Sequence, residues 1–395
     1  MQPDIRSAVS GQRNERVDAL RGFALLGILL VNIQSFLYGA ANPLGYVGPE
    51  AGVLDRIVYF ATAAFISLKF MPLFAMLFGA GFSLLYVKLS ARSDQPKRIY
   101  MRRMAFLFIF GVLHGFFFYY GDITHMYALA GLVLLAYVER DAAGIGRAAA
   151  LWWIGATVFN LLVITLLGSV APLPQDLAPL VQQNFDAFAA LGYIAQLPLR
   201  ANEFANVAIG NLFGFPLTVA LMLTGMWAQR AGLLTNLHAR GWRVGGWLGV
   251  LIGVPAAVVF GYSALGEVDT HGLGATTWNA AIPQLISVTL AFFYAASVIR
   301  FAPDALVRLL APAGRMPLTN YFLQSVAMGA VLSGWGLAVG PQLNYWQTAA
   351  LAVLIFALQI VFSRLWLSRA RQGPLEALWR NWTYRGVSHG VTGAG

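Results

Sequence analysis

A histidine and an aspartate lie eight residues apart in one of the most apolar stretches of the 395-residue chain. His114 is part of the run RRMAFLFIFGVLHGFFFYY, and Asp122 follows Gly121, where this run ends and a second apolar run begins. Ionisable side chains inside a membrane span are costly and rare, and most of them are functional. If the chain turns back at Gly121, the carboxylate can orient the imidazole as a general base. His114 and Asp122 are therefore the candidate catalytic pair, and the alternative is a hydrogen-bonded packing histidine.

Two arginines at the start of the same run could hold a phosphorylated ligand, because guanidinium groups suit bidentate phosphate contacts. Arg102 and Arg103 open the run, and Arg103 lies eleven residues before His114. At about 100° per residue, that spacing returns to the same helix face. His125, three residues after Asp122, is a further candidate for substrate binding.

Polar side chains also share faces on two other apolar segments. In RVDALRGFALLGILLVN, Asp18 and Arg21 are three residues apart, and Asn32 follows Arg21 by eleven. These spacings place all three side chains in one polar stripe along a helix. Asn320 and Gln324, four apart, share a face near the C-terminal third of the chain. We expect all of them to bind substrate. For the first stripe, the alternative is an ion pair at the membrane interface with Asn32 bonding a neighbouring helix.

The elements that position these residues must be membrane-spanning helices. The chain is 58% hydrophobic and 11% charged, whereas soluble domains contain about 25% charged residues. This composition predicts an all-α, polytopic integral membrane protein with interfacial helices. Its net charge of +10 is explained by basic cytoplasmic loops, so no nucleic acid partner is expected. The absence of cysteine excludes disulfides, thiol nucleophiles and thiolate metal sites.

Charge sorting sets the predicted topology. With ten spans and a cytoplasmic N-terminus, only three of the 26 Lys and Arg residues lie outside, as the positive-inside rule requires. An eleventh span over residues 50–68 would place six basic residues outside, so we expect an interfacial or re-entrant helix there. Both termini are then cytoplasmic, and the first span is retained rather than cleaved. The ten spans cover residues 19–39, 70–90, 103–120, 123–139, 148–168, 207–229, 243–262, 279–300, 318–336 and 346–367.

Four motifs resemble the YeiB-like family of bacterial inner-membrane proteins, in the right order over nearly the whole chain. They are RVDALRGFALLGILLVN, RRMAFLFIFGVLHGFFFYYGDITHMYAL, GRMPLTNYFLQS and GPLEALWR. The family is similar to membrane acyltransferases such as heparan-α-glucosaminide N-acetyltransferase and the acyltransferase-3 proteins, which share the D-x-x-R-G opening, here Asp18, Arg21 and Gly22. In acyltransferase-3 proteins a catalytic histidine follows that arginine by eleven residues, where this chain has Asn32. The base is therefore expected at His114 instead.

The resemblance implies one transmembrane domain over residues 1–395, with an acyltransferase-like half at 16–140 and a YeiB-like half at 207–385. It implies transfer of an acyl group, foremost acetyl, from cytoplasmic acyl-CoA to a sugar, lipid-linked or small-molecule acceptor. Acyl-CoA, foremost acetyl-CoA, is the expected co-substrate, no metal is expected, and membrane lipids and a small-molecule or glycan acceptor are the expected partners. The expected location is the bacterial inner membrane, and a homodimer stays open. A transporter or flippase using the same polar groups is the alternative function, and a structural or signalling role is the third.

Overall fold

The computed structural model describes residues 14–42, 44–48, 50–170, 178–234, 236, 239–266 and 275–385. Helices dominate this part of the chain, and the described ranges contain no β-strand. The acidic segment 267–274, predicted to lie outside, is beyond the described residues. The α-helices are α1 (Glu15–Ser35), α2 (Val53–Ala61), α3 (Phe70–Ser90), α4 (Pro96–Phe117), α5 (Thr124–Val133), α6 (Ala142–Val170), α7 (Ala178–Ala190), α8 (Tyr193–Arg230), α9 (Arg240–Leu248), α10 (Val254–Ala264), α11 (Ala275–Phe301), α12 (Asp304–Gly314), α13 (Pro317–Leu332), α14 (Tyr345–Leu367) and α15 (Pro374–Tyr384).

Apolar helices long enough to cross a membrane confirm the predicted fold class. Within the described residues, seven helical stretches meet that length and composition, and two shorter apolar helices cover 124–137 and 286–301. Helix α13 has 16 residues, fewer than the roughly 20 that a span requires. The predicted count of ten spans therefore stays a prediction. The seven stretches are Glu15–Ser35, Val53–Ser90, Pro96–Phe117, Ala142–Val163, Tyr193–Arg230, Arg240–Ala264 and Tyr345–Leu367.

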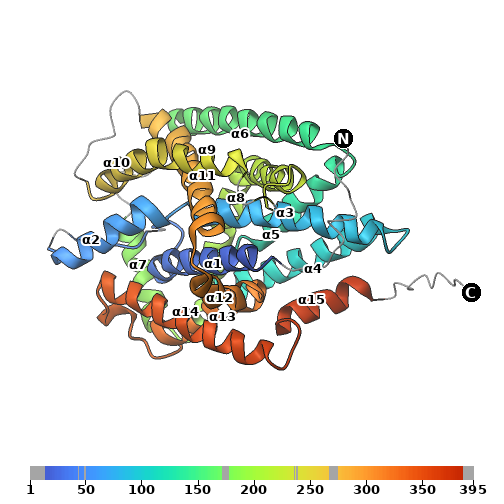
Figure 1. The fold of residues 1–395 in the computed structure, drawn as a ribbon. Helices are drawn as coiled ribbons and strands as arrows, with labels where there is room; N and C mark the ends of the chain where they lie inside the picture. Colours follow the sequence, from blue (N-terminus) through green and yellow to red (C-terminus); the bar gives the residue numbers. More distant parts are fainter. Residues whose placement is uncertain are drawn as a thin grey trace, which may run out of the picture.

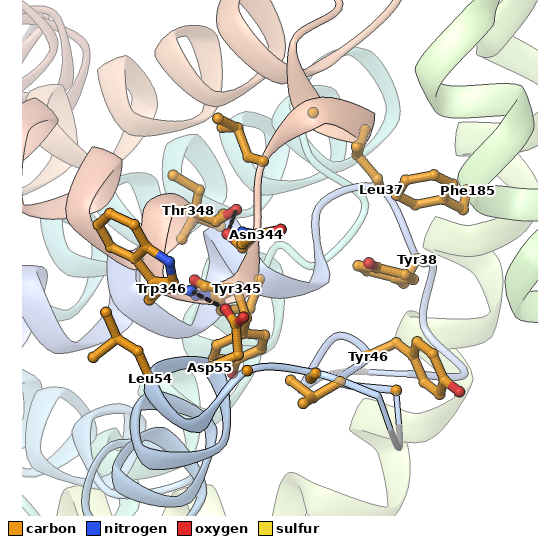
Figure 2. Close-up of a pocket in the computed structure, with 18 of the residues that line it drawn as sticks. Leu37, Tyr38, Tyr46, Leu54, Asp55, Phe185, Asn344, Tyr345, Trp346 and Thr348 are labelled. Atoms are coloured by element: carbon orange, nitrogen blue, oxygen red, sulfur yellow. Dashed lines mark hydrogen bonds between the residues drawn. The ribbon is translucent and has the colours of Figure 1, made fainter.

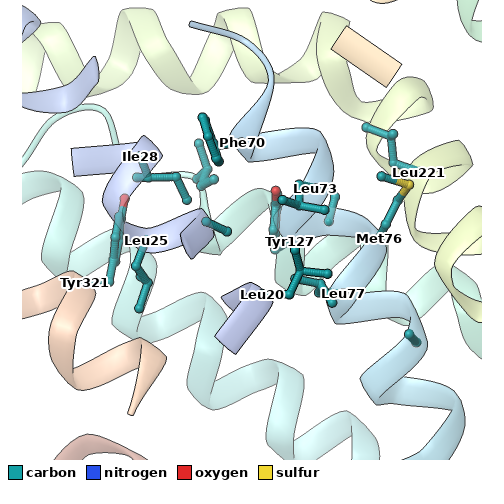
Figure 3. Packing of buried hydrophobic residues seen from close by; sticks show 14 of the residues in the cluster. Leu20, Leu25, Ile28, Phe70, Leu73, Met76, Leu77, Tyr127, Leu221 and Tyr321 are labelled. Atoms are coloured by element: carbon teal, nitrogen blue, oxygen red, sulfur yellow. The ribbon is translucent and has the colours of Figure 1, made fainter. Parts of the chain in front are cut away.

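Helix α1 runs through the middle of the bundle (Figure 1) and packs against α3, α11, α12, α13 and α14. Its apolar side chains continue into one large core, in which Leu25 and Leu29 are fully buried. Figure 3 shows part of this core, where residues of α1, α3 and α5 meet. A helix buried on all sides is apolar all round, which leaves its few polar side chains facing protein.

A reciprocal glycine contact holds α3 against α8. A Cβ at Gly79 would lie 1.8 Å from the carbonyl oxygen of Met222, and a Cβ at Gly225 would lie 1.8 Å from that of Met76. Any side chain at either position would force the helices apart. Small residues that allow close backbone approach are a common device of membrane bundles.

The two ends of the bundle differ in charge. We call the end where α3 ends and α4 begins the basic end, because Lys88, Arg92, Lys97 and Arg98 lie there. At the opposite end, the segment predicted to be interfacial forms α2 and a π-helical turn over Thr62–Ile66. A turn at residues 67–69, with Leu68 at a φ of +64°, separates it from α3. The segment 50–68 is therefore a helical unit of its own.

Candidate functional site

The candidate catalytic pair lies where α4 meets the connection to α5. His114 belongs to the last turn of α4, and Asp122 lies in the tight connection that follows. Nδ1 of His114 is 2.8 Å from Oδ2 of Asp122. The other ring nitrogen, Nε2, is 2.9 Å from Oγ of Ser325 on α13. An imidazole between a carboxylate and a hydroxyl is the arrangement that activates serine nucleophiles. We call these three residues the relay.

Asp122 is held as an ionised acceptor by several donors. Its Oδ1 accepts hydrogen bonds from the backbone N–H of Thr124 at 2.7 Å and from the Thr124 hydroxyl at 2.9 Å. Nδ1 of His125 lies 3.3 Å from the same oxygen. Burial opposes ionisation of the Asp122 carboxyl, but hydrogen bonds with His114 and His125 outweigh it, and the pKa of Asp122 is lowered. The carboxylate therefore accepts the Nδ1 proton of His114, which leaves Nε2 as the acceptor for Ser325.

A glycine permits the connection to approach α4. A Cβ at Gly111 would lie 2.4 Å from the backbone nitrogen of His125, 2.5 Å from Oγ1 of Thr124 and 2.8 Å from Oδ1 of Asp122. Because glycine lacks this atom, the connection folds directly onto the helix that carries His114. The pairing of His114 with Asp122 thus depends on a small residue one turn earlier.

Aromatic rings enclose the imidazole. The ring of Phe110 stacks on His114 with centroids 5.5 Å apart, and Tyr321 lies against it at 5.0 Å. His114 and Ser325 are 2% and 1% exposed, and neither lines the two cavities that border α1. The relay lies one side-chain layer behind a cavity wall, since Thr124 and Tyr321 do line one.

That cavity, which we call the arginine cavity, has a volume of about 340 Å³ and lies between α1, α3, α4 and α15. Arg21, Arg103 and Arg315 line it, and Arg21 donates a hydrogen bond to Asp18 at 2.9 Å. The guanidinium of Arg103 stacks on Trp379 of α15, 3.6 Å from the ring centroid. Apolar and aromatic side chains form most of the remaining wall. An apolar cavity with a few convergent cations suits an anionic group attached to an apolar or neutral chain.

Glu376, the acidic residue that lines this cavity, already accepts hydrogen bonds from the protein backbone. Oε1 of Glu376 on α15 accepts the backbone N–H groups of Leu318 and Thr319, at 2.7 and 3.1 Å. These are the first amides of α13, which have no partner inside their own helix. Glu376 therefore caps α13 from another element, and it positions the helix that carries Ser325.

Four of the predicted binding residues lie away from both the relay and the arginine cavity. Nη1 of Arg102 donates to the backbone oxygen of Arg385 at 2.7 Å on the exposed surface. Asn32 is half-buried and lines neither cavity. Asn320 and Gln324 are buried, but they contact α14 and α1 instead of the relay. The structure thus brings together His114, Asp122 and His125, and separately Asp18, Arg21 and Arg103.

Sequence reasoning did not find Ser325. It lies 211 residues after His114, in the motif GRMPLTNYFLQS, directly after Gln324. Tyr321 and Ser325 are four residues apart and share a helix face. That spacing was an available signal, yet a serine in an apolar helix is common and commonly bonds its own backbone. Only the packing of α13 against α4 distinguishes it.

Relatives of this chain extend over almost its entire length. It is 31% identical to the uncharacterized protein YeiB of Escherichia coli, over 96% of this chain and 99% of that protein. It is 28% identical to the uncharacterized protein YxaH of Bacillus subtilis, over 94% of this chain and 95% of that one. Residues 228–386 match the family described as a protein of unknown function, DUF418. No solved structure matches the chain. Because the match to YeiB covers both proteins almost completely, the chain belongs to the YeiB-like family.

Proposed function

We propose that this protein is a membrane-bound acyltransferase in which Ser325 accepts the acyl group from an acyl thioester. The observation that carries the proposal is the position of the His114 imidazole, 2.8 Å from Asp122 and 2.9 Å from Ser325. A general base for an incoming acceptor needs a free ring nitrogen. Here Asp122 bonds Nδ1 of His114, and the Ser325 hydroxyl bonds Nε2, which is the other ring nitrogen. The serine is therefore the group that His114 can activate.

The proposed reaction proceeds in two halves. Nε2 of His114 takes the Ser325 proton while Oγ attacks the thioester carbonyl, the C–S bond breaks, and the imidazolium returns the proton to the leaving thiolate. The acyl group is then an ester on Ser325. In the second half, His114 takes a proton from the acceptor hydroxyl or amine as it attacks this ester, the ester bond to Oγ breaks, and the imidazolium returns the proton to Oγ of Ser325. Asp122 stabilises the imidazolium in both halves.

The arginine cavity supports the choice of an acyl-CoA donor, foremost acetyl-CoA. Arg21 and Arg103 present charged donors that suit phosphate, and the apolar wall suits the neutral pantetheine arm. The lining includes Tyr321, whose ring lies against the imidazole of His114 with centroids 5.0 Å apart. A displacement of this ring would connect the cavity to the relay.

The proposal places the donor site on the cytoplasmic side of a bacterial inner membrane. The arginine cavity lies toward the basic end, and basic residues collect in cytoplasmic loops. Both termini are then cytoplasmic. Reporter fusions at Ser93, between α3 and α4, and at Asn344, before α14, should report opposite sides. If the fusions at both positions report the same side of the membrane, this topology is wrong.

Covalent labelling tests the reaction without knowledge of the acceptor. The purified protein in nanodiscs is incubated with acetyl-CoA, and its intact mass and the released CoA thiol are measured. We expect one acetyl group on Ser325 and an equal amount of thiol. Ser325→Ala and His114→Ala should abolish both signals. The matched control is Ser363→Ala, because Ser363 is equally buried and bonds Asn320, but lies away from the relay.

A transporter is the second candidate, because separate cavities border the two ends of α1, lined by Arg21 at one end and by Gln34 at the other. Transport coupled to protons needs the His114–Asp122 pair but not the serine hydroxyl. Solute uptake that survives Ser325→Ala and fails in His114→Ala, together with no acetylated protein, favours transport. Acetylation that persists in Ser325→Ala contradicts the proposed acyl-serine.

A further inference from the structure

A second cavity lies at the end of the bundle opposite to the basic end. It has a volume of about 630 Å³ and is bordered by the end of α1, the segment after it, α2 and the start of α14 (Figure 2). This volume is in the range of small-molecule sites. Its lining contains Glu50 and Asp55, and no lysine or arginine is among its described lining residues. We call it the acidic pocket.

Two nearly buried side chains leave acceptor oxygens open in this pocket. Asp55 is 8% exposed; its Oδ1 accepts the backbone N–H of Trp346 at 3.0 Å, and its Oδ2 has no partner in the described ranges. Gln34 is 3% exposed and donates from Nε2 to the backbone oxygen of Tyr345 at 3.2 Å. Its Oε1 likewise lacks a partner among the described residues. Two open acceptor oxygens that border one pocket suit a ligand that donates hydrogen bonds.

Three polar side chains at the start of α14 are already engaged within the protein. The hydroxyl of Tyr345 donates to the backbone oxygen of Leu44 at 3.0 Å, and that of Thr348 donates to the oxygen of Asn344 at 3.1 Å. The side chain of Asn344 bonds the first turn of α14. The charged groups that remain for a ligand are the carboxylates of Asp55 and Glu50, so the lining is negatively charged.

Aromatic rings complete the lining. Tyr38, Tyr46, Tyr345 and Trp346 border the pocket; in Figure 2, Tyr345 and Trp346 lie beside Asp55, and Tyr38 and Tyr46 lie on the other side of the pocket. Phe185 supports the ring of Tyr38, with centroids 5.0 Å apart. The faces of aromatic rings attract cations, more strongly where water is excluded. Carboxylate, open amide oxygen and aromatic faces thus favour the same class of ligand.

We propose that the acidic pocket binds a small organic cation that carries amine N–H donors. An ammonium group would lie between Oδ2 of Asp55 and Oε1 of Gln34, with its carbon chain against the aromatic rings. Anions such as carboxylates and phosphates would be repelled by the charge of Asp55 and Glu50. The proposal does not depend on acyl transfer, because it concerns a different cavity and none of its residues belongs to the relay.

Equilibrium binding to the full-length protein in nanodiscs tests the proposal. Putrescine is the probe, 1,4-butanediol is its uncharged analogue of the same chain length, and succinate is its anionic counterpart. We expect saturable binding of putrescine by calorimetry, and weak or no binding of the other two. The Asp55→Asn variant keeps the acceptor for the Trp346 N–H and removes the charge. It should weaken putrescine binding by about tenfold or more, the factor that about 1.4 kcal/mol produces.

Two controls make the result specific. Asp186→Asn removes a carboxylate from the exposed surface of α7, where Asp186 accepts from Gln182 at 2.8 Å, and it should leave binding unchanged. Gln34→Met, which removes the open oxygen at similar volume, should weaken binding less than Asp55→Asn does. Equal binding of putrescine and butanediol, equal losses in the two aspartate variants, or no saturable binding of putrescine, spermidine and tyramine would overturn the proposal.

Discussion

Helix α13 places polar residues in the core on two of its faces, and the two faces meet different neighbours. On one face, Nδ2 of Asn320 donates to Oγ of Ser363 at 3.0 Å, and Nε2 of Gln324 donates to Oε1 of Gln359 at 3.1 Å. These partners lie on α14. We call this set the amide face. All of its members are neutral and bond one another between two helices.

The other face of α13 is built from Tyr321 and Ser325. Ser325 meets the imidazole of His114, and Tyr321 lies both against that imidazole and along the arginine cavity. This face therefore combines ionisable groups with a nearby cavity. Burial does not distinguish the two faces, since Asn320 and Ser325 are 0% and 1% exposed.

The difference teaches which buried polar groups of a membrane protein merit a functional hypothesis. Neutral amides between helices stabilise packing, typically by about 0.6 kcal/mol per hydrogen bond in a bundle. Ionisable groups cost more to bury and are retained where they act. By this criterion we expect the face with Ser325 to be functional and the amide face to be structural, although both belong to one motif in the sequence. The following predictions test this separation.

Loss of the imidazole should have the largest effect. His114→Ala removes the group that activates Ser325, and we expect a loss of acyl transfer of about 10²–10⁴-fold. Initial rates of CoA release measure this. Added imidazole should restore part of the rate if the ring acts as a base, and it would restore nothing if His114 only fills space.

A methyl group at Gly111 should disrupt the relay from outside it. The new Cβ of Gly111→Ala would approach Oδ1 of Asp122 to 2.8 Å, and displacement of a catalytic group by about 1 Å can cost about 10²-fold in rate. Gly155→Ala on α6 is the control, because nothing lies within 4 Å of its added Cβ. Equal rates in the two variants would show that the connection tolerates the displacement.

Two neighbouring arginines should differ in their effect on donor affinity. Arg103 lines the arginine cavity, whereas Arg102 points to the surface. Loss of one charge-assisted hydrogen bond costs about 1.5–3 kcal/mol, so Arg103→Gln should weaken CoA binding by about tenfold or more. Arg102→Gln should leave it unchanged. Calorimetric titration with CoA measures both affinities. Equal losses of affinity in the two variants would contradict the assignment of the arginine cavity as the donor site.

The amide face should affect stability alone. Gln359→Leu removes the partners of Gln324 and of the backbone oxygen of Asn320, and we expect a loss of about 1 kcal/mol in unfolding free energy. The rate per folded molecule should not change. Thermal unfolding in detergent and CoA release measure the two quantities. A large loss of rate in this variant would mean that the two faces of α13 act as one site.

The sequence by itself determined the membrane class, the all-α fold and the pairs that are close in the chain. Asp18 and Arg21 pair because helical geometry brings residues three apart together. His114 and Asp122 pair because a glycine-marked turn joins two apolar runs. Composition and local geometry suffice for such features, because neither depends on how the helices pack. Their catalytic and binding roles stay predictions.

The tertiary structure alone decided which of these groups share a site. Ser325 reaches His114 across 211 residues, and Asn320 and Gln324, from the same motif, turn away from it. Arg103 and Arg102 are adjacent in sequence, yet one lines the cavity and the other meets the C-terminal end of α15. A helix face is fixed by sequence, but the neighbour that it meets is fixed by packing between distant segments. Small residues such as Gly79 and Gly111, whose added Cβ atoms would clash, set that packing, and their consequences appear only in three dimensions.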